Sequence, residues 1–234
     1  MTGTTVVLVH GAFADASSYA PVTGRLLERE VPVVVPAVPN RSLLGDSDYV
    51  ASIVRSIPGP VLLVGHSYGG AVITVAGAQD NVTGLVYLSG YALVEGESLG
   101  ELQGGFPDSD LPAALVYTPL PFPGGESGTD VSVAPARFAD VLGHDVDPQL
   151  MGVLAASQRP LAAAAFEEQA PVAAWRTKPA WALVSSSDRT INPDVERHGY
   201  RRAGIAAVEV DSSHLVMLSH PDVVVDLILT ALNG

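Results

Sequence analysis

The fold of this chain is decided by the stretch Pro60-Val-Leu-Leu-Val-Gly-His-Ser-Tyr-Gly-Gly-Ala-Val-Ile-Thr-Val-Ala76. Its apolar start is typical of a buried strand, its end is typical of a helix, and the pattern Gly65-x-Ser67-x-Gly69 joins the two. A serine on so sharp a turn presents its hydroxyl clear of the backbone, and side chains in place of the glycines would clash. The stretch predicts that Ser67 is a nucleophile; the competing interpretation is a glycine-rich turn with a capping serine.

Strand and helix signals alternate on both sides of this turn. The β-branched run Thr5–Val9 is typical of a strand that is buried on both faces of a parallel sheet. This alternation predicts an α/β fold with a mostly parallel sheet of about six strands, flanked by helices. The other expected strands are 31–35, 60–64, 85–88, 180–184 and 206–210, and the expected helices include 17–29, 48–57 and 221–232.

The alternation stops between residues 91 and 178. We expect this segment to be a helical lid inserted into a core of residues 1–90 and 179–234, because ligands of such folds bind at the carboxyl edge of the sheet. The Pro/Gly-rich segment 117–125 is interpreted either as a mobile part of the lid or as a surface loop. Three lid helices are expected after it, namely 132–142, one capped by Asp147 with Pro148 at its first position, and 160–169.

Composition and charge exclude several classes of function. The 234 residues carry a net charge of −13, which repels phosphate backbones and anionic lipids, so we expect no nucleic-acid or membrane partner. The absence of cysteine excludes disulfides and thiolate sites, and no metal-ligand spacing or nucleotide motif points to a metal or cofactor. No basic segment precedes an apolar one at the start, so a cytoplasmic location is expected. The sequence leaves a homodimer open.

A serine nucleophile needs a base, and the base needs an acid that fixes its tautomer. His214 follows the expected strand 206–210 and precedes the last helix, which places it at the same sheet edge as Ser67. Asp188 follows the strand 180–184, and the chain order Ser67, Asp188, His214 is that of an α/β-hydrolase triad. Asp211 is a rival acid, but it lies only three residues from His214 and is poorly placed to reach the far ring nitrogen.

Acyl transfer also requires hydrogen-bond donors for the oxyanion of the tetrahedral intermediate. One donor should be the backbone N–H of the residue after the nucleophile, Tyr68, and the other should come from the loop after the first strand. That loop reads His10-Gly-Ala-Phe13, and the Ala12 N–H is the natural second donor. His10, at the end of the first strand, is expected to order this loop. The competing interpretation of the loop is a plain glycine turn.

These pieces together resemble the α/β-hydrolase family, and within it the small-lid group of plant methyl esterases and hydroxynitrile lyases with their bacterial relatives. In the lyases of that group a lysine follows the catalytic histidine and a threonine follows the histidine of the first strand. Leu215 and Gly11 occupy those positions here, which favours the esterase branch. The matching pieces are 9–12, 65–70, 154–155, 159–160, 187–191 and 213–221.

The resemblance and the triad together predict a serine hydrolase of the carboxylesterase type. Its substrate is expected to be a small to medium apolar ester, because the lid is rich in apolar side chains and poor in positive charge. Two alternatives are a carbon–carbon lyase that uses Ser67 and His214 as acid and base, and a ligand receptor without catalysis. The candidate substrate-binding residues are Phe13, Tyr117, Phe122 and Leu215.

Overall fold

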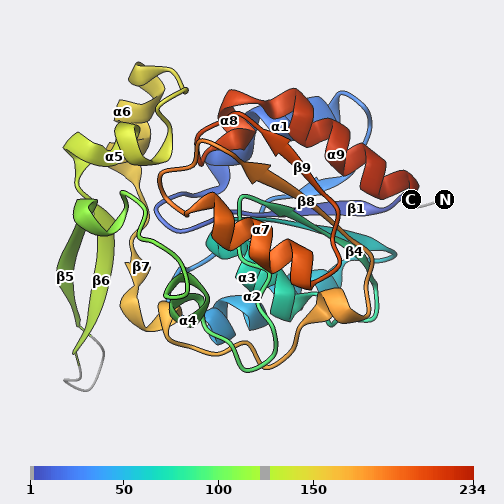
Figure 1. The fold of residues 1–234 in the computed structure, drawn as a ribbon. Helices are drawn as coiled ribbons and strands as arrows, with labels where there is room; N and C mark the ends of the chain where they lie inside the picture. Colours follow the sequence, from blue (N-terminus) through green and yellow to red (C-terminus); the bar gives the residue numbers. More distant parts are fainter. Residues whose placement is uncertain (1–2, 122–126) are drawn as a thin grey trace.

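The computed structural model describes residues 3–121 and 127–234, and a parallel sheet of six strands forms its centre (Figure 1). The strand order is β2-β1-β3-β4-β8-β9, so the chain starts one strand from an edge, adds β2 at that edge and then proceeds across the sheet to β9. The prediction of a mostly parallel sheet is confirmed, since all five strand pairings within this sheet are parallel. The strands are β1 Thr5–Val9, β2 Val33–Val34, β3 Val61–His66, β4 Val82–Leu88, β8 Ala180–Ser185 and β9 Ala207–Val210.

The two central strands show why apolar runs without alternation form this sheet. In β1 and β3, Leu8 pairs with Val64 and Val7 with Leu63, and all four side chains are buried. A strand covered by helices on both faces has no solvent side, so every position favours an apolar residue. The helices α1 Ala20–Leu27 and α9 Pro221–Asn233 pack on one face, and α2 Leu43–Ser56, α3 Tyr68–Ala76 and α7 Pro193–Arg202 cover the other (Figure 1).

Capping residues set two helix boundaries that differ from expectation. The helix expected at 48–57 begins earlier, at Leu43, because the Ser42 Oγ accepts a hydrogen bond from the Gly45 N–H at 3.1 Å. The helix expected at 17–29 is divided into a 3₁₀ turn, Ala16–Tyr19, and α1. Asp15 caps the 3₁₀ turn, and the chain then turns into α1 through Pro21 at its second position.

The segment between β4 and β8 contains a second sheet that the sequence analysis did not expect. β5 Leu115–Pro121 and β6 Ser127–Val133 form an antiparallel pair, and β7 Leu161–Ala162 adds to β6. The loop interpretation of 117–125 is therefore wrong as far as Pro121. Val131 and Val133 are buried while the side chains between and beside them are only partly covered, a pattern of one sheet face packed on the core.

Two of the three helices expected in this segment are present, and the third expectation is wrong. α5 Pro135–Leu142 and α6 Pro148–Ser157 lie side by side, and Asp147 caps α6 as expected. Residues 160–169 instead form β7 and a 3₁₀ turn, because the Ala162 N–H donates to the Asn40 carbonyl at 2.9 Å and this part of the chain pairs with β6. The remaining short helices are α4 Leu99–Gln103 and α8 Val216–Ser219, with 3₁₀ turns at Pro112–Ala114, Ala163–Phe166 and Ala174–Arg176.

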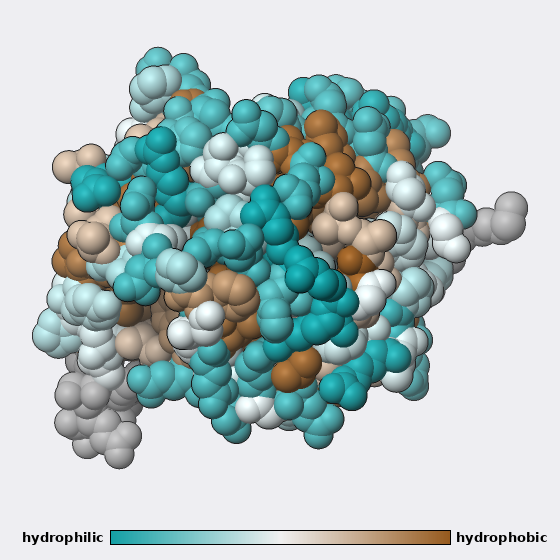
Figure 2. Space-filling model, viewed as in Figure 1, coloured by the Kyte–Doolittle hydropathy of each residue, from teal (hydrophilic) through white to brown (hydrophobic). Residues whose placement is uncertain are grey.

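The face of the molecule seen in Figure 2 is mostly hydrophilic, with an apolar area over β8, β9 and α9. There the exposed edge strand β9 leaves Val208 48% accessible. β9 has only four residues, and its Glu209 is held by Arg197 at 2.8 Å, features that limit edge-to-edge pairing. Within residues 3–121 and 127–234, no helix has the length and apolar character that crossing a bilayer requires.

Candidate active site

Ser67 occupies a strained turn between β3 and α3. Its backbone has φ 56° and ψ −123°, a left-handed conformation that is costly for a residue with a side chain. A Cβ at Gly65 would lie 2.3 Å from the Gly69 carbonyl oxygen, and a Cβ at Gly69 would lie 2.3 Å from the Val9 carbonyl oxygen. Both glycines of the motif are therefore required by backbone contacts, as the sequence analysis expected.

Neighbouring segments hold this turn in place. The Ser67 N–H donates to the Leu88 carbonyl at 3.1 Å, and the Ser67 carbonyl accepts from the Gly70 and Tyr91 N–H groups at 2.9 and 3.3 Å. The Tyr200 hydroxyl on α7 accepts from the Gly90 N–H and donates to the Gly90 carbonyl, each at 2.9 Å. The strained turn is thus fixed by β4, the loop after it and α7.

His214 and Asp188 form a buried pair at the carboxyl edge of the sheet. His214 Nδ1 lies 2.6 Å from Asp188 Oδ2, and the two side chains are 2% and 0% exposed. The other oxygen, Asp188 Oδ1, accepts from the backbone N–H groups of Thr190 and Ile191 at 2.6 and 3.0 Å. With Nδ1 donating to Asp188, the Nε2 of His214 is left to act as a base.

His66, beside the nucleophile, packs against the histidine of this pair. The two imidazole rings have centroids 4.5 Å apart, and His66 Nε2 lies 2.9 Å from the His214 carbonyl oxygen. Burial lowers the pKa of His66 well below its usual value, so this ring is neutral and its Nε2–H donates to that carbonyl. Ser67 Oγ and His214 Nε2 are not hydrogen bonded in this conformation, in which the His214 ring bonds through Nδ1 to Asp188.

The rival acid lies elsewhere. Asp211 Oδ1 accepts from the Ser187 hydroxyl at 2.6 Å at an exposed position, and it makes no hydrogen bond with His214. The structure therefore pairs His214 with Asp188, not with Asp211. Asp194 lies in the first turn of α7 and pairs with Arg197 at 2.9 Å, consistent with a helix-start role.

The loop after β1 lies directly against the nucleophile. A Cβ at Gly11 would be 2.7 Å from the Ser67 Cβ. Among the described residues the Ala12 N–H has no hydrogen-bond acceptor, and Tyr68 is the first residue of α3, whose N–H has no partner within the helix. Phe13 is unsuitable as a donor because its N–H donates to the Arg159 carbonyl at 3.0 Å. Ala12 and Tyr68 therefore both carry a backbone N–H group without an acceptor among the described residues.

His10 orders this loop, as the sequence analysis suggested. Its Nε2 accepts from the Val38 N–H at 3.1 Å, and its Nδ1 lies 2.9 Å from the Gly11 carbonyl oxygen. Burial lowers the pKa of His10, which favours the neutral ring that these two contacts require. Both ring nitrogens of His10 are therefore engaged with the backbone.

The candidate substrate-binding residues fall into different places. Phe13 and Leu215 are buried next to Ala12 and His214, respectively. Tyr117 is 63% exposed on β5 and lines a cavity of about 300 Å³ whose lining holds none of Ser67, Asp188 and His214. Phe122 lies outside the described residues. The other residues that line this cavity are Gln103, Leu111, Pro112, Leu115, Val131, Ala163, Phe166 and Glu167.

Sequence reasoning missed Glu196 on α7. Its side chain is buried, and neither carboxylate oxygen has a hydrogen-bond donor among the described residues. Burial and the nearby negative charge of Asp188 raise the pKa of Glu196 well above its usual value, so the neutral form of this acid is favoured in the folded protein. The charged segment Asp194-Val-Glu-Arg197 does not indicate that Glu196 is buried, because this burial arises only from the packing of α7 on the sheet.

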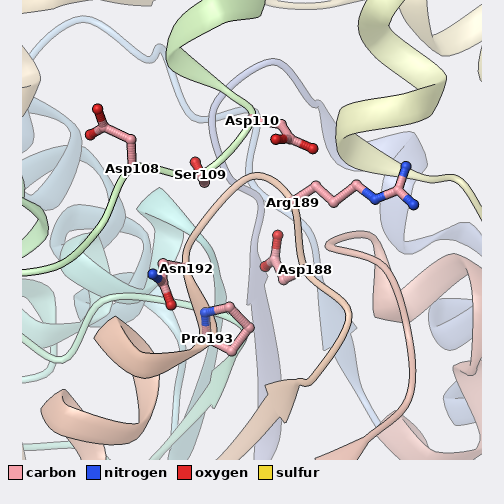
Figure 3. Close-up of a pocket in the computed structure, with 7 residues that line it drawn as sticks. All are labelled: Asp108, Ser109, Asp110, Asp188, Arg189, Asn192 and Pro193. Carbon is pink, nitrogen blue, oxygen red and sulfur yellow. The ribbon is translucent and has the colours of Figure 1, made fainter.

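A second cavity, of about 270 Å³, opens on the loop that carries Asp188 (Figure 3). Its walls come from residues 108–110 and from the loop 188–193 after β8. The two walls are hydrogen bonded to each other, since the Asp110 N–H donates to the Arg189 carbonyl at 3.0 Å and the Ser109 hydroxyl to the Thr190 carbonyl at 2.8 Å.

In the part of the chain that the structure describes, no group of three or more His, Asp or Glu side chains could hold a metal ion.

Comparison with known proteins places this geometry in a family. Residues 6–227 match the sequence model of the Alpha/beta hydrolase family. No curated protein matches the sequence significantly. Similar solved structures are polyneuridine aldehyde esterase (TM-score 0.82, 18% identity, covering 97% of this chain and 98% of that one), a pyrethroid hydrolase from Sphingobium faniae JZ-2 (0.80, 21%, 100% and 98%) and the methylesterase MES16 from Arabidopsis (0.82, 16%, 98% and 99%). The chain belongs to the α/β-hydrolase family.

Proposed function

We propose that the protein is a serine hydrolase of the carboxylesterase type, acting through an acyl-enzyme on Ser67. The observation that carries the proposal is the buried 2.6 Å contact between His214 Nδ1 and Asp188 Oδ2, at the sheet edge where Ser67 occupies its strained turn. A structural histidine needs no buried carboxylate on one ring nitrogen and no second nitrogen left without a hydrogen-bond partner among the described residues. Both features are what a general base requires.

The reaction follows from these groups. His214 Nε2 removes the proton of the Ser67 hydroxyl while Oγ forms a bond to the ester carbonyl carbon. The N–H groups of Ala12 and Tyr68 stabilise the oxyanion, and the intermediate collapses as His214 returns the proton to the leaving alcohol. A water molecule, deprotonated by His214, then attacks the acyl-enzyme and releases the carboxylic acid and Ser67. Asp188 orients His214 and stabilises its protonated form.

Apolar esters of small to medium size are the proposed substrates. The cavity that contains Tyr117 is lined mainly by apolar side chains, among them Leu111 and Phe166, and no arginine or lysine lines it. Two hydrogen bonds through Tyr91 link its wall to the nucleophile turn: Gln103 accepts from the Tyr91 hydroxyl at 2.8 Å, and the Tyr91 N–H donates to the Ser67 carbonyl at 3.3 Å. The names of the similar structures, two of them esterases, agree with an ester substrate.

The departures from the lyase pattern favour hydrolysis over carbon–carbon cleavage. Leu215 is buried directly after His214, so no lysine stands there to stabilise an anionic leaving group. The net charge of −13 likewise disfavours polyanionic partners, and we propose no metal or cofactor for the reaction.

Labelling with a fluorophosphonate probe tests the proposal, because the probe reacts covalently with an activated serine. We expect labelling of the wild type and its loss in Ser67→Ala and His214→Ala. Ser187→Ala is the matched control, since Ser187 is a serine close to Asp188 whose hydroxyl donates to Asp211. Labelling that persists in Ser67→Ala, or an unlabelled wild type that binds ligands tightly without turnover, contradicts the proposal.

A further inference from the structure

The turn between α5 and α6 is bonded to the backbone on both sides of His214. Asp145 Oδ2 accepts from the Ser213 N–H at 3.0 Å, and Asp145 Oδ1 accepts from the Ser213 hydroxyl. One residue after the histidine, the Leu215 N–H donates to the Leu142 carbonyl at 3.1 Å. Residues 213–215 are buried, so their polar groups need partners within the protein, and Asp145 and Leu142 supply acceptors for the Ser213 and Leu215 donors.

The same turn also holds the loop that carries the acid. The Thr190 hydroxyl donates to the Val141 carbonyl at 2.9 Å, and His144 Nε2 lies 3.1 Å from the Ser187 carbonyl oxygen. Arg189 pairs with Asp140 at 2.5 Å. The segment 140–145 therefore contacts residues on either side of Asp188 as well as of His214.

Asp145 is the charged residue of segment 140–145 whose side chain is bonded to Ser213, the residue before His214. Although partial burial acts in the opposite direction, hydrogen bonds from Ser213 hold the pKa of Asp145 below its usual value. His220 is a titratable group near it, with its Nδ1 4.0 Å from Asp145 Oδ2. Ionised acceptors form stronger hydrogen bonds than neutral ones, so the carboxylate fixes Ser213 more firmly than a neutral side chain could.

We propose that Asp145 is a positioning residue for His214, and that the α5–α6 turn is a fixed part of the catalytic centre. The inference rests on the proposed function of Ser67 and His214. The direction of the His214 imidazole depends on the backbone at 213–215. Asp145 and Leu142 hold this backbone by hydrogen bonds at two points, Ser213 and Leu215. Without the carboxylate, the buried Ser213 N–H and hydroxyl lose their acceptor, and the loop must shift to find another.

The chain offers a matched control two residues away. Asp147 is an exposed carboxylate at the N-terminus of α6, where its Oδ1 accepts from the Leu150 N–H at 2.9 Å. Asp147→Ala removes the same charge from the same turn and weakens the same helix pair, but it touches neither catalytic loop. Asp145→Asn keeps one acceptor oxygen for Ser213 and serves as the conservative variant.

The test measures kcat and KM on p-nitrophenyl butyrate, with the melting temperature, for wild type, Asp145→Ala, Asp145→Asn and Asp147→Ala. A small displacement of a base costs up to about 100-fold in rate, so we expect kcat of Asp145→Ala to fall by about 10- to 100-fold with KM nearly unchanged. Asp145→Asn should recover part of this loss, and Asp147→Ala should lower only the melting temperature. An unchanged kcat in Asp145→Ala, or equal losses in Asp145→Ala and Asp147→Ala, would overturn the proposal.

A second measurement does not depend on turnover. The Nδ1–H proton of a histidine bonded to a buried carboxylate gives a far-downfield NMR signal, and we expect this signal of His214 to weaken or move in both Asp145 variants but not in Asp147→Ala. If Asp145→Ala does not fold, Asp145→Asn carries the test. A wild type without esterase activity or labelling refutes the proposed function, whereas an undisturbed His214 signal in the Asp145 variants refutes the positioning role.

Discussion

Gly11 and Ser67 are so close that a Cβ on Gly11 would lie 2.7 Å from the Ser67 Cβ and 3.0 Å from the His66 carbonyl oxygen. No side chain fits between the loop after β1 and the nucleophile turn. The position of the Ala12 N–H relative to Ser67 therefore depends on the absence of a side chain at Gly11.

Gly11→Ala should therefore impair catalysis more than stability. The added methyl group pushes the loop and the Ala12 N–H away from the site of the oxyanion, and loss of one such donor costs about 10²–10³-fold in kcat. Steady-state kinetics on p-nitrophenyl esters measure this loss. Gly24→Ala is the control, because a Cβ there meets no atom within 4 Å and the helix position favours alanine. A Gly11→Ala enzyme with normal kcat would show that the Ala12 N–H is not a donor.

Asp188→Asn and Asp211→Asn should differ by several powers of ten in kcat. Asp188 fixes the tautomer of His214, and loss of the corresponding carboxylate in a serine protease costs about 10⁴-fold. Asp211 accepts a hydrogen bond from the Ser187 hydroxyl and makes none with His214, so Asp211→Asn should keep a rate within about threefold of wild type. The rates are compared at one pH on one ester. Similar losses in both variants would contradict the assignment of the acid.

Tyr200→Phe should destabilise the protein and slow catalysis. The hydroxyl satisfies both the N–H and the carbonyl of the buried Gly90, which packs against the Ser67 backbone. Leaving these two groups unpaired costs about 1–3 kcal/mol of unfolding free energy. Urea denaturation measures the cost, and Tyr49→Phe, at an exposed position on α2, should show no comparable change. Equal stability of Tyr200→Phe and wild type would contradict this role.

The central sheet was predictable because each strand is specified locally. In β1 and β3 continuous apolar runs indicate burial on both faces, and the serine turn marks where β3 ends. The pairing of His214 with Asp188 followed from their positions after β9 and β8, since carboxyl ends of parallel strands meet at one edge. That geometry is a property of the winding and needs no knowledge of packing.

The second sheet and the supporting residues were not predictable for the opposite reason. β5 contains Pro119 and Pro121, which argue against a strand, and the alanine-rich segment around β7 favours a helix. Pairing between β5, β6 and β7 overrides both preferences. Asp145 and Glu196 owe their surroundings to contacts with segments far away in the chain, for which the local sequence holds no signal.

Glu196→Gln should change how stability depends on pH. Burial, together with the charge of Asp188, raises the pKa of Glu196 in the folded protein well above the unfolded value of about 4.3. Above that unfolded value the folded state binds one proton more than the unfolded state, so the unfolding free energy falls as pH rises toward the folded pKa. A glutamine cannot ionise, so Glu196→Gln should be more stable than wild type near neutral pH and should lose this part of the pH dependence.

Glu209→Gln provides the contrast for this prediction, because Arg197 lowers the pKa of Glu209 at the exposed edge strand. A lowered folded pKa contributes stability above the unfolded value of about 4.3, and this contribution is lost as pH falls through the folded pKa. Glu209→Gln should therefore be slightly less stable than wild type near neutral pH. Urea denaturation of both variants and wild type at about pH 5 and about pH 8 separates the two signs. A Glu196→Gln protein that is less stable than wild type at the higher pH would mean that Glu196 is ionised beside Asp188.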